Sequence, residues 1–231
     1  MPNRSKDSTK LVAAEIIACC RCPRLVAWRE EAAANPPARF RGEEYWGRPV
    51  PGFGDPQARL LLVGLAPAAH GGNRTGRVFT GDRSGDWLFR ALHKAGFANQ
   101  PTSVHKGDGL KLTRAYVTAA CRCAPPDNKP LPEELANCRP FLLREIELLK
   151  NLRAILGLGK IGFDTAFDAL RSLGKTSLKS RPKFAHGAEV QVSENLTLLG
   201  TFHPSQQNTF TGKLTEPMLD AIFSRARELF D

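Results

Sequence analysis

The chain has 231 residues, 42% of them hydrophobic and 24% charged, which is typical of one globular domain or two small ones rather than of a disordered chain. Its 33 Lys and Arg residues outnumber 23 Asp and Glu residues, and the net charge of +10 favours a polyanionic partner such as nucleic acid. No segment approaches the roughly 20 apolar residues that a membrane span needs, and the polar residues 1–10 carry no secretion signal. We therefore expect a cytoplasmic protein with no membrane partner. In that compartment the six cysteines are expected to be metal ligands or free thiols.

Four short apolar segments predict buried strands, and helical patterns lie between them. The strand candidates are residues 59–65, 115–120, 154–158 and 196–202, and the helical candidates are 87–95, 132–149, 163–174 and 219–229. Continuous apolar strands are typical of a parallel sheet that is covered on both faces. The alternation predicts a three-layer α/β/α fold with a central four-stranded, mainly parallel sheet.

The sequence shows no internal repeat and no linker, so we predict a single domain over residues 1–231. In an open parallel sheet the functional loops lie at the carboxyl ends of the strands. Polar, Gly- and Pro-rich loops follow three of the predicted strands, at residues 64–82, 121–130 and 203–213. We expect these three loops to form one cleft.

The cysteines suggest a metal site. A Cys-x-x-Cys pair lies near the N-terminus and two further cysteines lie mid-chain, giving the candidate ligands Cys19, Cys22, Cys123 and Cys138. Two such pairs brought together satisfy zinc or an iron–sulfur cluster, and the spacing does not choose between them. Ordinary buried thiols are the alternative, and the neighbouring Cys20 and Cys121 leave the ligand set open.

Two further loops carry candidate chemistry. His203 ends a strand, and Pro204 after it favours an extended backbone that aims the imidazole out of the sheet edge. Such a histidine can donate a hydrogen bond to charge on a leaving group, although a structural role is equally common. Asp82 can orient a water molecule or, equally well, begin the following helix. Phe79 offers a face for a stacked base.

The remaining polar residues of these loops are candidates for contacts with DNA phosphates. They are Arg74, Arg77, Ser205, Gln207, Asn208, Thr211 and Lys213. The GxxxxGK[ST] phosphate loop is absent from the sequence, which argues against an NTPase.

Four motifs in this order carry a family resemblance. They are GLAPAAHG (64–71), GRVFTGD (76–82), CAPPDNKP (123–130) followed by CRP (138–140), and HPSQQNTFTG (203–212). Together with the four cysteines they resemble the bacterial and archaeal iron–sulfur uracil-DNA glycosylases, most closely the B-type enzymes called family 5. The resemblance runs from Cys19 to the last helix.

The resemblance implies a structural [4Fe-4S] cluster on the four candidate cysteines, which ties residues 1–30 to the core. It implies that Phe79 stacks on a flipped base, that His203 contacts the pyrimidine O2, and that the HPSQQNTFTG loop enters the minor groove. Asp82 and Asn128 would complete the catalytic set. The first motif would add Gly64, Ala66 and His70 to the binding of the base.

Two positions depart from the related A-type enzymes. Leu65 stands where those enzymes have an acid, and Ala119 stands where they carry a uracil-reading Asn. Both fit the B-type pattern and suggest that hypoxanthine and other deaminated bases in double-stranded DNA are substrates besides uracil. No lysine lies in the first loop, which predicts hydrolysis to an abasic site without lyase activity.

The expected protein is a monomeric, nucleoid-associated base-excision enzyme of a prokaryote. The alternative is a non-catalytic DNA-binding protein with a redox-sensitive iron–sulfur cluster. A zinc-dependent hydrolase is weaker still, because no HExxH or similar ligand set accompanies the cysteines.

Overall fold

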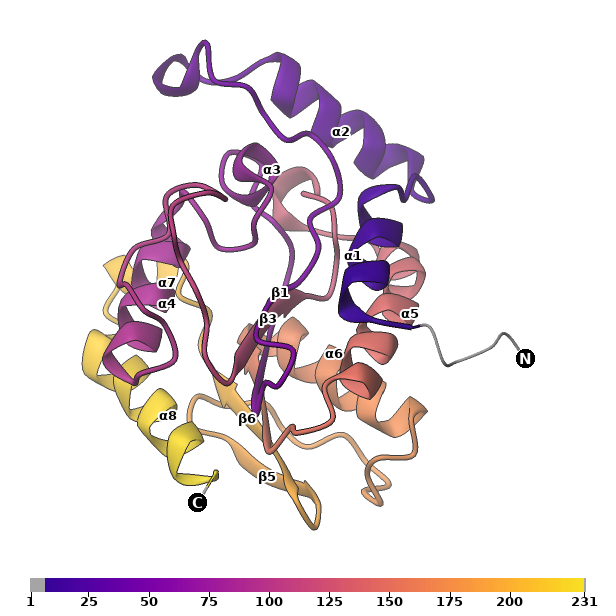
Figure 1. Cartoon of the computed structure of the whole chain (residues 1–231), viewed down its shortest axis with the longest axis vertical. Coiled ribbons are helices and arrows are strands. Elements are labelled where there is room, and N and C mark those ends of the chain that lie inside the picture. Colours follow the sequence, from indigo (N-terminus) through magenta and orange to yellow (C-terminus); the bar gives the residue numbers. More distant parts are fainter. Residues whose placement is uncertain (1–6, 231) are drawn as a thin grey trace.

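The computed structural model describes residues 7–230. The first six residues of the polar N-terminal stretch, and the last residue of the predicted 1–231 domain, lie outside this range. Helices flank a twisted central sheet on both sides (Figure 1). Among the described residues, no helix has the length and apolar character to cross a bilayer.

The sheet has six strands in the order β1-β3-β2-β4-β6-β5. The strands are β1 (Phe53–Gly54), β2 (Leu60–Gly64), β3 (Ala115–Ala119), β4 (Ala154–Leu158), β5 (Glu189–Ser193) and β6 (Leu196–Thr201). The four central strands are parallel, and their residues are buried at every position, as their continuous apolar sequences predict.

The prediction of a four-stranded sheet is wrong, because it misses the two edge strands. These are β1, which pairs antiparallel with β3, and β5, which pairs antiparallel with β6. β1 is only two residues long, and most residues of β5 are exposed or half-buried. Neither gives the apolar run by which the central strands are recognised.

The α-helices are α1 (Thr9–Ile17), α2 (Pro23–Ala34), α3 (Gly72–Thr75), α4 (Arg83–Lys94), α5 (Pro132–Leu148), α6 (Gly159–Ser172), α7 (Gln206–Phe210) and α8 (Glu216–Glu228). Short 3-10 turns, η2 (Ala38–Phe40) and η3 (Pro126–Asn128), interrupt two loops. The four helices expected from periodicity correspond to α4, α5, α6 and α8.

Two hydrophobic cores, one on each face of the sheet, confirm the three-layer arrangement. One core joins alternate strand residues such as Leu62 to α4 and α8, through Phe89 and Phe223. The other joins the intervening residues such as Val63 to α5 and α6, through Phe167. This alternation is the period of two of a β-strand, with each face buried under its own pair of helices.

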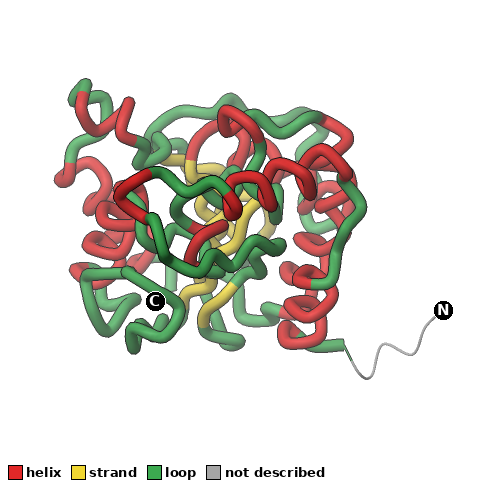
Figure 2. The backbone as a smooth tube through the Cα atoms, turned by 90° about the horizontal axis from the view of Figure 1, so that it is seen from above, coloured by secondary structure: helices red, strands yellow, loops and turns green. Residues whose placement is uncertain are grey.

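The N-terminal helices lie outside the second layer. Val12 and Ile16 of α1 are fully buried against Phe141 of α5. α2 follows a short turn, and Arg24 joins it to α5 by donating two hydrogen bonds of 2.8 Å to the Glu134 carboxylate. Figure 2 views the molecule from the top of Figure 1, the side of α2 and α3, with loops lying over the strands. The parallel strands β2, β3, β4 and β6 have their carboxyl ends at one edge of the sheet, where the loops that follow them begin.

Candidate active site and cysteine cavity

One cavity of about 570 Å³ lies where the loops after β2, β3 and β6 meet. Because these strands are parallel, their carboxyl ends open on the same edge of the sheet. The residues that line the cavity are Leu65, Ala66, Ala68, Phe79, Asp82, Arg83, Ser84, Asp127, Asn128, His203, Ser205, Gln206 and Gln207. The structure therefore brings all three predicted catalytic residues together with Phe79.

Phe79 forms a buried wall of this cavity, with 7% of its surface exposed. Its backbone has φ 53°, in the left-handed region that few non-glycine residues adopt. Two glycines allow the position: a Cβ at Gly64 would lie 2.7 Å from Phe79 Cζ, and a Cβ at Gly85 would overlap the Phe79 carbonyl. The lack of a side chain at Gly64 thus leaves room for the aromatic ring, and Gly64 does not itself line the cavity.

His203 lies beside Phe79, with 5.7 Å between ring centroids and 34° between ring planes. Asn208 Nδ2 donates a hydrogen bond of 2.8 Å to the His203 carbonyl and so fixes the turn into α7. Burial lowers the pKa of His203 to about 4. The imidazole is therefore neutral at pH 7, with one N–H available as a donor.

Of the two roles that the sequence left open for Asp82, the structure shows the start of the helix, and it also places this residue in the lining of the cavity. Asp82 is the N-cap of α4, and its Oδ1 accepts a hydrogen bond of 2.9 Å from the Gly85 amide. A Cβ at Gly71 would overlap Oδ2, so only glycine permits the carboxylate to lie here. Burial raises the pKa of Asp82, although the amide of Gly85 favours the charged form.

Asn128 lies at the rim, in the turn η3, and its side chain is exposed. Its neighbour Asp127 also lines the cavity and brings a second carboxylate that the sequence analysis did not select. Both residues have φ 55°, a conformation for which Asn and Asp are enriched. The prolines of CAPPDNKP indicate a turn here, but they do not show which of its polar residues line the cavity.

Among the described residues, several predicted contacts lie away from the cavity. The ring of His70 is held between Phe40 and Tyr45, and its Nδ1 is 3.0 Å from the Tyr45 hydroxyl. It does not line the cavity, whereas Ala66 of the same motif does. The structure thus assigns His70 to packing of the segment that contains η2.

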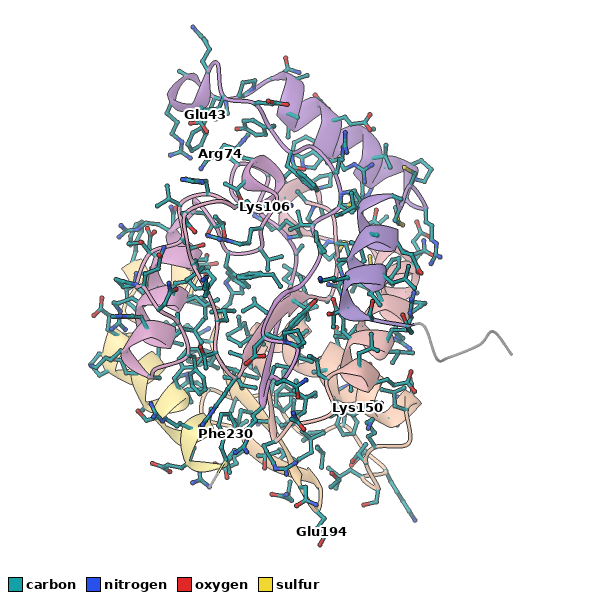
Figure 3. The ribbon with its side chains drawn as sticks, viewed as in Figure 1. Glu43, Arg74, Lys106, Lys150, Glu194 and Phe230 are labelled. Carbon is teal, nitrogen blue, oxygen red and sulfur yellow. The ribbon has the colours of Figure 1, made fainter. Side chains whose placement is uncertain are left out.

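Arg74 and Arg77 point into the protein rather than toward a phosphate backbone. Arg74 donates to Glu43 at 2.6 Å, and both residues are labelled in Figure 3. The Arg74 guanidinium also lies over the Phe40 ring, 4.1 Å from its centroid. Arg77 is 5% exposed and forms a 2.7 Å ion pair with Asp108. Both contacts argue against the predicted roles of these arginines in DNA binding, because the guanidinium groups already have partners.

The loop after β6 divides into cavity residues and outer residues. Ser205 and Gln207 line the cavity, and Asn208 is held by the His203 carbonyl. The exposed Thr211 donates to the Gln207 carbonyl at 2.6 Å. Lys213 is exposed, with its Nζ 4.8 Å from the centroid of the Phe202 ring.

Two exposed residues beside the cavity, Arg83 and Phe210, were not predicted from the sequence as contacts for DNA. Phe210 at the end of α7 is 69% exposed, and the guanidinium of Arg83 lies 5.4 Å from its ring centroid. Arg83 also lines the cavity. A large exposed aromatic residue next to a cation suits contact with nucleic-acid bases and phosphates.

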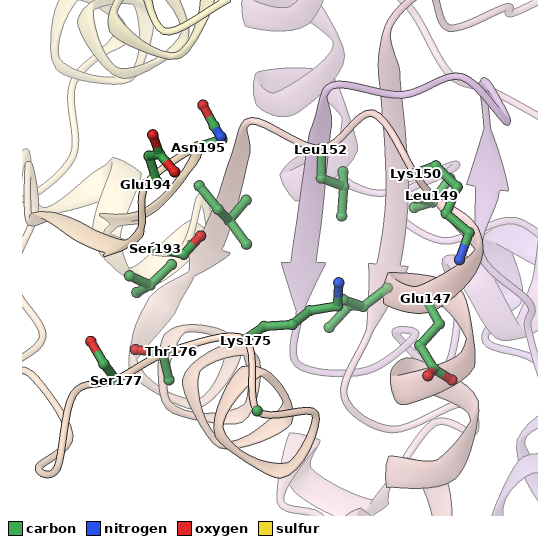
Figure 4. Close-up of a pocket in the computed structure, with 14 residues that line it drawn as sticks. Glu147, Leu149, Lys150, Leu152, Lys175, Thr176, Ser177, Ser193, Glu194 and Asn195 are labelled. Atoms are coloured by element: carbon green, nitrogen blue, oxygen red, sulfur yellow. The ribbon is translucent and has the colours of Figure 1, made fainter.

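A second cavity, of about 560 Å³, lies at the opposite end of the sheet (Figure 4). It is lined by the turn between β5 and β6, including Glu194, and by residues after α5 and α6, such as Lys150 and Lys175. Glu194 and Lys150 lie at one end of the molecule and Arg74 at the other (Figure 3). None of the predicted site residues lines this second cavity.

The four predicted ligand cysteines line a separate small cavity between α2, α5 and the loop after β3. Its lining residues are Cys19, Arg21, Cys22, Leu25, Val26, Arg29, Pro49, Arg122, Cys123, Asn137 and Cys138. Cys20 is exposed, and Cys121 is buried beside this group without lining the cavity. The structure thus gathers the same four thiols that the motifs selected.

Four thiols in one cavity are the donor set that a four-iron cluster requires. Within residues 7–230 no three His, Cys, Asp or Glu side chains surround one point closely enough for a single metal ion. A cubane cluster instead takes one thiolate at each iron, so its ligands surround a volume. Two buried donors, Arg29 Nε and Arg122 Nε, have no hydrogen-bond partner among the described residues, and both arginines line the cavity. The sulfides of a cluster would supply acceptors for such donors.

The two cavities are structurally connected through α2 and α3. Asn73 of α3 is 1% exposed and donates from Nδ2 to the Arg29 carbonyl at 3.1 Å. α3 belongs to the loop that holds Phe79 and Asp82. Displacing α2 would therefore disturb the packing of the loop that forms the first cavity.

Comparison with known proteins agrees with this geometry. Residues 51–227 match the family model described as the uracil DNA glycosylase superfamily. A type-5 uracil-DNA glycosylase of Mycobacterium leprae is 52% identical and covers 94% of this chain and 93% of its own. One from Thermus thermophilus is 50% identical, over 93% of this chain and 94% of its own. One from Mycobacterium bovis is 51% identical, over 93% and 79%. The chain therefore belongs to the uracil DNA glycosylase superfamily and groups within it with the type-5 enzymes.

Proposed function

We propose that this protein is a monofunctional uracil-DNA glycosylase, which hydrolyses the N-glycosidic bond of uracil in double-stranded DNA and leaves an abasic site. The observation that carries the proposal is the convergence of Phe79, Asp82, Asn128 and His203, from three separate loops, on one cavity. A DNA-binding protein without catalysis has no need of a half-buried carboxylate and a neutral imidazole in the same pocket. Such an enzyme would act in the prokaryotic cytoplasm, at the nucleoid.

Phe79 and His203 are proposed to act at different steps, the first in binding the base and the second in breaking its bond to the sugar. An extruded uracil stacks on Phe79, which returns about 1–3 kcal/mol of the few kcal/mol that extrusion costs. As the bond between C1′ and the base nitrogen breaks, negative charge develops on the base, and the neutral His203 donates a hydrogen bond to it. A donor placed in a buried site is worth more than in water, because water does not compete for the developing charge.

Asp82 is the candidate for positioning the attacking water. Its Oδ1 is occupied by the Gly85 amide, and its Oδ2 remains to accept a hydrogen bond from a water molecule in the cavity. The water oxygen forms a bond to C1′ of the oxocarbenium-like sugar, and the carboxylate accepts the proton that the water loses. Asn128 at the rim would hold the edge of the base, with Asp127 beside it as an alternative carboxylate.

The lining of the first loop supports a substrate range wider than uracil. Leu65, Ala66 and Ala68 present apolar side chains to the cavity, and none of them can read the polar edge of a base. A site without such side-chain contacts rejects a related base only weakly. We propose that hypoxanthine and other deaminated bases are removed too, more readily from mispairs, which cost less to open.

We propose that the protein binds duplex DNA as a monomer, and the surroundings of the cavity support the binding of DNA. Arg83 at the start of α4 is exposed, as are Lys129 and Lys213 on neighbouring loops and Phe210 at the end of α7. Cations near the opening suit the phosphates on either side of an extruded base. The lining residues of the cavity include no lysine, which supports hydrolysis without a Schiff base.

We propose a structural [4Fe-4S] cluster on Cys19, Cys22, Cys123 and Cys138. Its support is the shared cavity and the unpaired arginine donors around it. When bound, the cluster ties the turn between α1 and α2 to α5 and to the loop after β3. The chemistry at the base needs no electron from it.

The proposal is tested by incubating the purified protein with a labelled duplex that carries one U·G pair. We expect release of free uracil, detected by mass spectrometry, and strand cleavage at that position only after alkali. Trapping of a covalent DNA adduct by borohydride would contradict the monofunctional mechanism. Tight binding of the duplex without uracil release would favour the non-catalytic alternative.

A further inference from the structure

Two buried arginines line the cysteine cavity, and they differ in how their charge is balanced. Arg29 of α2 is 4% exposed and Arg122, after β3, is 1% exposed. Arg122 forms a 2.7 Å ion pair with Glu145, which is itself 1% exposed. The protein therefore supplies a full counter-charge for Arg122.

Arg29 has no comparable carboxylate among residues 7–230. Its one acidic contact there is Glu30, 4.0 Å away, with 63% of that side chain exposed to solvent. A buried cation is costly unless an anion balances it. The charge of Arg29 thus points to an anion that occupies the cavity.

The hydrogen bonds of Arg29 lead to the cysteines. Its Nη1 donates to the Cys123 sulfur at 3.2 Å and to the Cys19 carbonyl at 3.4 Å. Its Nη2 lies 3.8 Å from the sulfur of Cys20, which is not one of the four lining cysteines. Its Nε–H is buried and has no acceptor among the described residues. The Arg29 guanidinium therefore contacts the side chain of one predicted ligand, Cys123, and the backbone of another, Cys19. Its Nε–H is a further donor that can bind an acceptor in the cavity.

We propose that Arg29 is the counter-charge and hydrogen-bond donor of the iron–sulfur cluster, raising its reduction potential and slowing its loss. This inference rests on the [4Fe-4S] cluster proposed above. A cluster with four thiolate ligands is negatively charged, and reduction adds an electron. A nearby cation and hydrogen bonds to sulfur stabilise the reduced form, which raises the potential. Arg29 acts through the cluster and does not touch DNA, so it is a positioning residue.

The test compares the iron-loaded, full-length protein with three variants. Arg29→Met removes the charge and the donors, whereas Arg29→Lys keeps the charge but loses the planar fork that reaches two acceptors. Arg24→Met is the matched control: it removes an arginine of the same helix that pairs with Glu134 outside the cavity. Iron and sulfide are assayed, the potential is measured for the one-electron couple of the cluster, and the visible absorbance is followed in air.

We expect Arg29→Met to shift the reduction equilibrium at least tenfold toward the oxidised form, which is about 59 mV for one electron. Its cluster should bleach at least tenfold faster, Arg29→Lys should lie between it and the parent, and Arg24→Met should match the parent. Should Arg29→Met not fold, the Arg29→Gln and Arg29→Lys variants carry the comparison. Phe89→Leu separates general destabilisation, because Phe89 is fully buried under α4, away from the cysteine cavity, and its loss should leave the potential unchanged.

The two failures are distinguishable. A purified parent without iron and sulfide would overturn the proposed cofactor and this inference together. An iron-loaded parent whose potential and bleaching rate are unchanged in Arg29→Met would overturn the inference alone. Uracil release by the parent is scored separately and bears only on the proposed activity.

Discussion

The ring of His203 packs against the ring of Phe79, with centroids 5.7 Å apart and planes inclined by 34°. The apolar neighbour and the surrounding loops remove water from the imidazole, and burial lowers its pKa to about 4. The proposed stacking wall for a base and the proposed donor for its leaving group therefore pack against each other. A neutral imidazole agrees with the proposed role of His203 as an uncharged donor.

The first prediction concerns pH. Because the pKa of His203 is about 4, the titration of this residue should add no inflection near 6.5, the usual pKa of histidine, to the pH profile of uracil release. The folded protein also binds the proton less tightly than the unfolded chain. The stability associated with His203 is therefore complete above pH 6.5 and is lost as the pH falls from 6.5 toward 4. NMR titration of the His203 ring checks this; a pKa of 6 or above in the free protein would contradict it.

The second prediction separates the two carboxylates at the cavity. Asn is as good an N-cap as Asp, so Asp82→Asn keeps the start of α4 and removes a buried charge. Because folding raises the pKa of Asp82, its ionised form is disfavoured in the fold. We expect Asp82→Asn to be at least as stable as the parent in thermal unfolding but to release uracil much more slowly.

Asp127→Asn is the matched control, because Asp127 lines the same cavity but is exposed. It should keep most of the activity. The opposite result, with Asp127→Asn inactive and Asp82→Asn active, would assign the water to Asp127. In the parent, activity should fall on acidification with an inflection above 3.8, the ordinary pKa of an aspartate.

The third prediction concerns stacking on Phe79. Phe79→Leu should lower kcat/KM for uracil release roughly 5- to 150-fold, because a leucine cannot stack on the base. This range corresponds to a stacking free energy of about 1–3 kcal/mol. Phe89→Leu is the control: Phe89 is fully buried in the core between α4 and the sheet, away from the cavity. It should lower the melting temperature and leave uracil release below that temperature unchanged. Equal kcat/KM in Phe79→Leu and the parent would rule out stacking there.

The fourth prediction concerns removal of iron. Removal of the proposed cluster by a chelator should release the turn between α1 and α2, because Cys19 and Cys22 would no longer be joined to Cys123 and Cys138 through iron. Limited proteolysis should then cut near residues 18–35 while the sheet stays protected. Uracil release should also fall, because α2 holds α3 through the hydrogen bond from Asn73 to the Arg29 carbonyl. Unchanged proteolysis after complete loss of iron would contradict the structural role.

Much of this architecture was readable from local sequence. The central strands and the helices α4, α5, α6 and α8 follow from continuous apolar runs and helical periodicity, which burial between layers enforces. The convergence of three loops follows from the rule for parallel sheets. The edge strands β1 and β5 were missed, because a two-residue strand and a mostly exposed strand carry no such pattern.

Roles that depend on distant partners were not readable. Arg77 reads as a phosphate contact until Asp108, far along the chain, is found paired with it in the interior. His70 lies in a motif whose neighbours line the cavity, yet the Tyr45 hydroxyl holds its ring outside. The turn at Asp127 and Asn128 needs a left-handed backbone at two successive residues, and no sequence pattern predicts that conformation here.

The most direct test is a single-turnover measurement of uracil release from a U·G duplex by the parent and by His203→Ala. Loss of one preorganised donor costs roughly 100- to 1,000-fold in rate, and we expect a drop of that size with little change in DNA binding. His186→Ala is the control, since His186 is half-buried against Thr201 outside the cavity and should leave the rate unchanged. A His203→Ala variant that releases uracil as fast as the parent would show that the cavity is not where the bond is broken.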